Sequence, residues 1–99
     1  MASPGSAQST VTGYWFCLEI SGNDYYANAP FAAPNHVTIQ HRAMGGFSAY
    51  VAQQYGAKGA PQCYAYPTPA GASTAVQRKS DWARQAGLRV VATHWVYQP

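Results

Sequence analysis

The chain has 99 residues, which is enough for one domain with a single modest core. Hydrophobic residues make up 47% of it, which excludes a disordered tail, and no apolar run reaches the roughly 20 residues that a membrane-spanning helix needs. Charged residues make up only 9% and give a net charge of +3, too thinly spread for the basic stripe of a nucleic-acid-binding protein.

Residues 1–10 are small and polar, without the basic and hydrophobic regions of a signal peptide. We expect a disordered lead-in there, followed by a single α+β domain over residues 11–99. The chain takes its polarity from uncharged side chains, a balance that is commoner in exported proteins, so we expect a secreted or periplasmic location.

Two strands joined by a tight turn are predicted at the start of the domain. Residues 11–20 are rich in β-branched and aromatic side chains, which favour a strand. Gly22 suits the first central position of a two-residue turn because it tolerates a positive φ, and residues 25–31 then form the returning strand. This turn sets the register of the hairpin, with Ile20 opposite Tyr25.

Side chains alternate between the two faces of a strand, so the register gives the hairpin one apolar face and one mixed face. The apolar face, which holds Phe16 and Leu18, is expected to be the core side. The mixed face is expected to be open, and it carries Trp15, Cys17, Glu19, Tyr26 and Asn28.

Helices and strands are predicted to alternate after the hairpin. Residues 36–42 contain a short β-branched run that suggests an additional strand. Residues 46–55, entered through the pair Gly45-Gly46, show the three- and four-residue apolar steps of a helix. A second helix is predicted over residues 70–86, with Trp82 in its apolar stripe. The remaining strands are expected over residues 60–66 and 88–97.

The order strand, strand, helix, strand, helix, strand predicts an α+β fold. Each helix has one apolar stripe, so each should pack on a sheet and not be surrounded by other elements. The expected architecture is a four-stranded sheet, or a five-stranded one if residues 36–42 add a strand, with both helices on one face.

The order of elements over residues 37–97 resembles that of small exported domains, such as the SPOR domain, that bind cell-wall glycan across a sheet bearing aromatic residues. The resemblance implies an α+β fold in which the sheet binds glycan. The glycine-containing strand motif of that family and a counterpart of the leading hairpin are both missing, so no functional residue is carried over.

The histidines and acidic residues predict neither a metal site nor a bound cofactor. His36 and His41 are an odd number of residues apart, which on a strand points them to opposite faces, and a zinc site needs three or four converging ligands. His94 alternates with apolar residues of the last strand, so we expect it to be partly buried and hydrogen-bonded. Glu19 lacks a second carboxyl group for paired-carboxylate catalysis.

Cys17 and Cys63 leave two alternatives open. If they are bonded, the protein belongs in an oxidising compartment, and Tyr64 and Tyr66 turn inward. If they are free, they are packing residues or reactive thiols, and those tyrosines enlarge the open face. A free thiol paired with His94 gives the alternative function, a small thiol- or histidine-dependent enzyme.

Aromatic residues give the strongest positive signal for function. An open sheet face with several such rings and little charge has the composition of a binding surface, which stacks on sugars or anchors a protein. We therefore expect a non-catalytic module that binds a protein partner or a cell-envelope glycan, or forms a homodimer, through this face. The residues expected to bind are Trp15, Tyr26, Tyr64, Trp95 and Tyr97.

Overall fold

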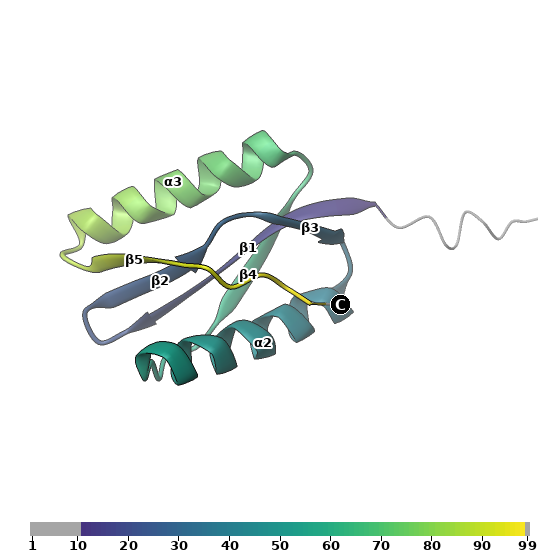
Figure 1. Cartoon of the computed structure of the whole chain (residues 1–99). Coiled ribbons are helices and arrows are strands. Elements are labelled where there is room, and N and C mark those ends of the chain that lie inside the picture. Colours follow the sequence, from purple (N-terminus) through teal and green to yellow (C-terminus); the bar gives the residue numbers. More distant parts are fainter. Residues whose placement is uncertain (1–10, 99) are drawn as a thin grey trace, which may run out of the picture.

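A computed structural model describes residues 11–98 of the protein (Figure 1). It contains a five-stranded sheet and two helices, which confirms the predicted α+β fold. The lead-in predicted for residues 1–10 lies outside the described residues. In chain order the elements are β1 (Thr12–Ser21), β2 (Asp24–Asn28), β3 (Phe31–Pro34), α2 (Val37–Tyr55), β4 (Gln62–Tyr66), α3 (Pro69–Gln85) and β5 (Arg89–Thr93).

The long strand β1 lies in the middle of the sheet. Strand β4 pairs with one side of β1, while β2 and β3 pair in succession with its other side, all three antiparallel to it. Strand β5 pairs with β2 in parallel. The hairpin register is as predicted, because Ile20 lies opposite Tyr25 and the turn residue Gly22 has a φ of 60°.

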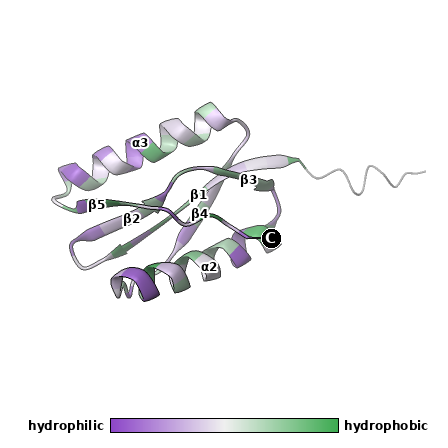
Figure 2. Ribbon diagram, in the orientation of Figure 1, coloured by the Kyte–Doolittle hydropathy of each residue, from purple (hydrophilic) through white to green (hydrophobic). Residues whose placement is uncertain are grey.

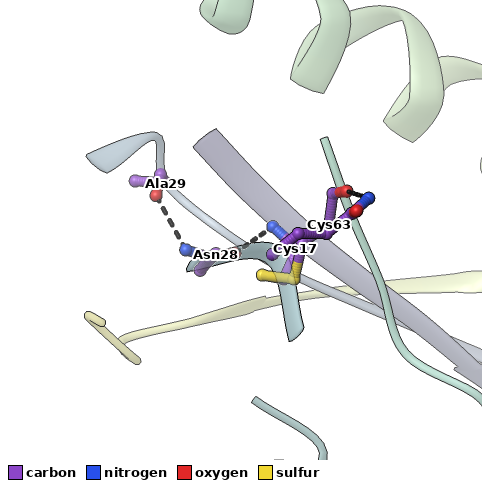
Figure 3. The surroundings of a disulfide bond; sticks show 5 residues. Cys17, Asn28, Ala29 and Cys63 are labelled. Atoms are coloured by element: carbon purple, nitrogen blue, oxygen red, sulfur yellow. Dashed lines mark hydrogen bonds between the residues drawn. A yellow bond between two sulfur atoms is a disulfide. The ribbon is translucent and has the colours of Figure 1, made fainter. Parts of the chain in front are cut away.

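The returning strand, predicted as one run over residues 25–31, is divided in two. Asn28 marks the break: its Oδ1 accepts a hydrogen bond from the Cys17 N–H at 2.7 Å, and its Nδ2 donates to the Ala29 carbonyl at 3.0 Å (Figure 3). Pro30 follows, and proline has no N–H to offer a neighbouring strand. The side chain of Asn28 therefore satisfies backbone groups where β2 and β3 separate.

The two helices pack on opposite faces of the sheet, so the prediction that both lie on one face is wrong. Figure 1 shows the sheet between α2 and α3. Helix α2 covers the face that holds Trp15 and Cys17, and α3 covers the face that holds Phe16 and Leu18. Both faces of the hairpin are rich in apolar side chains, so each needs a cover. The face expected to be open is the one beneath α2.

Helix α2 is longer than the predicted helix over residues 46–55, and the strand suggested for residues 36–42 is wrong. His36 caps the helix, since its Nδ1 accepts a hydrogen bond from the Thr38 N–H at 3.0 Å. The glycine pair lies inside the helix and not at its entry. At Gly46 an added Cβ would come within 3.0 Å of the Trp95 ring, so the glycine makes room for that tryptophan.

Helix α3 agrees with its prediction over residues 70–86 to within one residue at each end. Thr68 caps it by accepting a hydrogen bond from the Gly71 N–H, and Gly87, with a φ of 84°, follows its end. Figure 2 shows hydrophobic and hydrophilic residues interspersed along both helices, as expected for helices with one face on a sheet. Trp82 departs from its prediction, because 52% of it is exposed.

The last strand, predicted over residues 88–97, ends at Thr93. His94 is exposed, which contradicts its expected partial burial. Residues 94–98 have no regular structure, yet Tyr97 is buried in the layer beneath α2 and Trp95 packs against that layer. Neither helix of the described residues has a stretch long and apolar enough to cross a membrane.

Candidate binding groove beside strand β4

Cys17 and Cys63 form a disulfide that joins β1 to β4 (Figure 3). Their Cα atoms are 4.0 Å apart and lie directly opposite each other in the strand register. Both cysteines are buried beneath α2, so Tyr64, the next residue of β4, points to the other face. Tyr64 and Tyr66 are half-buried there against Phe16, which is the arrangement expected of the bonded alternative.

The disulfide also bears on the enzyme alternative. That alternative needs a thiol nucleophile, and both cysteines of the chain are in the disulfide. His94 lies exposed beyond the end of β5. Within residues 11–98, no three histidine, cysteine or acidic side chains are grouped as metal ligands would be.

Four of the five aromatic residues expected to bind come together, but as part of the packing beneath α2. Trp15, Tyr26 and Tyr97 are only 3%, 4% and 9% exposed. The half-buried Trp95 packs against Phe47, with its ring centroid 5.6 Å away. Helix α2 therefore covers the surface that alternation along the hairpin had suggested would be open.

A groove of about 500 Å³ lies on the opposite face, between α3 and β4. The largest exposed side chain along it is Trp82, and the small residues Gly71 and Ala75 leave room beside the sheet. Lys79 lies over the half-buried ring of Tyr64, with its Nζ 5.5 Å from the ring centroid. The residues that line the groove are Tyr66, Gly71, Thr74, Ala75, Arg78, Lys79 and Trp82.

The chain has three acidic side chains, and none of them lines this groove. Glu19 is buried beneath α2, where its Oε2 accepts a hydrogen bond from the Gly59 N–H at 3.0 Å. Burial raises the pKa of this carboxyl group, and the hydrogen bond from Gly59 partly opposes that effect. Asp24 pairs with Arg89 at 2.8 Å, and Asp81 pairs with Arg84 at 3.4 Å.

Arg78 and Lys79 are exposed, and neither forms a salt bridge within residues 11–98. They lie beside Trp82 on one flank of α3, because residues three and four apart are neighbours on a helix. The groove thus combines a broad aromatic surface with two positive charges that form no salt bridge within residues 11–98. Its chemistry suits a ligand that carries carboxylate or another anionic group.

Sequence patterns missed this groove, although its signal was present. Trp82 was assigned to the apolar stripe of its helix. Trp82 lies four residues beyond Arg78 and three beyond Lys79, so all three residues share one flank of the helix. The presence of two cations on the same flank as Trp82 indicates that its ring is exposed and not part of the core.

A second hollow, of about 400 Å³, lies on the other face of β4, beside the start of α2. Its lining includes the edge of Trp15 and the polar side chains of Asn35 and Gln40. Gln40 reaches the strand, because its Nε2 donates a hydrogen bond to the Cys63 carbonyl at 3.1 Å. Strand β4 is therefore bordered by a hollow on each face.

Comparison with known proteins finds no matching family model, curated protein or solved structure. The resemblance to the SPOR domain was one of element order over residues 37–97, and that stretch begins with helix α2 in place of the predicted strand. The functional assignment depends on the geometry and chemistry of the groove itself.

Proposed function

We propose that the protein is a small, non-catalytic binding module that works outside the cytoplasm. It holds an anionic partner, a protein or a cell-envelope glycan, in the groove between α3 and β4. The observation that carries this proposal is the exposed Trp82 beside Arg78 and Lys79, two cations without an acidic partner in the described chain.

The groove supplies two kinds of contact to such a partner. An exposed tryptophan gives a large flat surface for stacking on a sugar ring or for anchoring an apolar side chain. Arg78 and Lys79 give charge-assisted hydrogen bonds to carboxylates, and they disfavour cationic ligands. Together they favour an anionic ligand that also presents an apolar surface.

The extracytoplasmic location is supported by the disulfide. Disulfides persist in oxidising compartments and are rare in the reduced cytosol. Cys17 and Cys63 are both buried, which protects the bond from exchange with soluble thiols. The non-catalytic role is supported by the same bond, since it removes the two candidate nucleophiles.

The proposal is tested by titrating the oxidised protein with two probes, poly-L-glutamate and acidic peptidoglycan fragments. The double variant Arg78→Gln with Lys79→Gln should bind about tenfold more weakly to whichever probe the parent protein binds, because two charge contacts are lost. Trp82→Ala should weaken binding by a similar factor. The matched control, Arg42→Gln with Lys58→Gln, removes the same charge elsewhere and should bind within about twofold of the parent protein.

Equal losses in the groove and control variants would show attraction to the overall charge and would overturn the proposal. Binding of neither probe by the parent protein would overturn it as well.

A further inference from the structure

We propose that the partner is an acidic segment of another protein, which joins the sheet as an additional strand along the outer edge of β4. This inference rests on the proposed function, because it uses the same groove, and it names the class of partner. Strand addition of this kind draws affinity from main-chain hydrogen bonds and specificity from alternate side chains.

The backbone of β4 has its outward groups at alternate residues. The Cys17 N–H points away from β4, because it donates to Asn28 on the other side of β1 (Figure 3). Cys17 and Cys63 therefore form a close pair without mutual backbone hydrogen bonds, in line with their Cα separation of 4.0 Å. The Cys63 carbonyl points outward and accepts its hydrogen bond from Gln40.

Ala65 lies two residues beyond Cys63, so its N–H and C=O point to the same outer edge. No strand of residues 11–98 pairs with that edge. Gln40 covers one outward group of this edge, the Cys63 carbonyl. Proteins usually cover exposed edges more fully, to prevent unwanted pairing with other strands. Pro61 and Pro67 bracket the strand and limit the added segment to a few paired residues.

The two hollows that border β4 match the alternation of an added strand. Successive side chains of such a strand point to opposite faces, so one set faces the groove beside α3 and the other the hollow beside α2. Acidic side chains belong in the first set, where Arg78 and Lys79 lie. Side chains of the second set meet Trp15, Asn35 and Gln40 in the hollow beside α2.

Charge favours a different protein over a second copy of this chain. Antiparallel pairing of two β4 strands puts both α3 helices on the same face of the joined sheet. Arg78 and Lys79 of each copy then approach those of the other, and each chain already carries a net charge of +3. A glycan matches the charge but has no regular row of backbone amides to pair with Ala65.

The test uses a synthetic peptide of about eight residues in which glutamate alternates with valine. The control peptide has the same sequence with N-methyl groups on alternate amides, which removes the backbone donors along one edge and keeps every charge. The unmethylated peptide should bind at least about tenfold more tightly. Hydrogen exchange at the Ala65 amide should be fast in the free protein and at least tenfold slower in the complex.

A pair of variants tests the same edge from the protein side. Ala65→Pro removes the outward N–H without removing a bond to β1, so the protein should stay folded and lose the preference for the unmethylated peptide. Ala65→Ser keeps the N–H and should keep the preference. If the proline variant does not fold, the two peptides on the parent protein still decide the question.

The outcomes separate this inference from the proposed function. Equal binding of the two peptides, abolished by Arg78→Gln with Lys79→Gln, would leave the anion-binding groove in place and overturn strand addition. Binding of peptidoglycan fragments without the peptide would do the same in favour of a glycan. Dimerisation in sedimentation that is lost in Ala65→Pro would overturn it in favour of a second copy. Failure of every anionic probe would overturn both proposals.

Discussion

The two layers on either side of the sheet differ in how completely they are filled. Helix α2 buries the large side chains Phe47 and Val51, whereas the buried residues of α3 are Ala72, Ser80 and Ala83. The layer beneath α2 also contains the disulfide and a group of packed aromatic rings. The α3 layer has small contact residues instead, and a groove remains along its edge beside β4.

This difference shows that aromatic residues by themselves do not mark a binding face. The layer beneath α2 holds many aromatic rings, yet Trp15, Tyr26 and Tyr97 are all buried there. The single tryptophan of the α3 layer is 52% exposed, although it lines the groove. What surrounds a ring, more than the number of rings, decides whether it can bind a partner.

The largest expected effect comes from removing the disulfide. Cys17→Ala with Cys63→Ala should lower the free energy of unfolding by about 4 kcal/mol, because the bond closes a loop of 46 positions in the unfolded chain. Urea unfolding of the oxidised parent protein and the variant measures the difference. Reductant should destabilise the parent protein and leave the variant unchanged. A loss below about 1 kcal/mol would show that packing beneath α2 holds β1 and β4 together without the bond.

A matched pair of aromatic truncations compares the two layers directly. Phe47→Ala should lower the free energy of unfolding by at least about 3 kcal/mol, since it leaves a cavity in a filled layer. Trp82→Ala should change it by less than about 1 kcal/mol, because that ring is mostly in water. Thermal and urea unfolding measure both variants. Similar losses for the two would mean that the layers are equally well packed.

Local signals allowed part of the fold to be predicted from sequence. The hairpin register follows from Gly22, and the helix predicted over residues 70–86 agrees with α3 to within one residue at each end. The start of α2 was not predicted, because the β-branched run after His36 favours a strand locally, whereas the helix begins there at the His36 cap.

The candidate site shows the same division between local and tertiary information. The alternation of side chains along β1 is correct, since Trp15 and Cys17 share a face opposite to Phe16. Which face is covered depends on where α2 and α3 pack, and the residues of the hairpin do not determine that. The groove beside α3 was within reach of sequence reasoning, because its tryptophan and cations lie three and four residues apart.

A smaller effect is expected from the glycine pair inside α2. Gly45→Ala should raise the free energy of unfolding by about 1 kcal/mol, because alanine favours a helix and its Cβ meets nothing within 4 Å. Gly46→Ala brings the same gain in propensity, but its Cβ lies 3.0 Å from the Trp95 ring. We expect this variant to be less stable than Gly45→Ala by about 1 kcal/mol or more in urea unfolding. Equal stability would show that Trp95 is loosely held.

The smallest effect concerns the pH dependence of the filled layer, through Glu19. Burial raises the pKa of this carboxyl group above 4.5 in the folded protein, so the folded state holds its proton more tightly than the unfolded state does. Its contribution to stability therefore falls as pH rises from about 4.5 through the raised pKa. Glu19→Gln should remove this fall, and the stability of the variant relative to the parent protein should increase over that range.

Asp24→Asn serves as the control, because the sign of its effect is opposite. Arg89 lowers the pKa of the Asp24 carboxyl group, so that residue stabilises the folded protein above its ordinary pKa of 3.8 and loses the effect as pH falls. Unfolding free energies measured in urea at several pH values should thus diverge in opposite directions for the two variants. A parallel pH profile for Glu19→Gln and the parent protein would mean that water reaches Glu19. The layer beneath α2 would then not be closed to solvent.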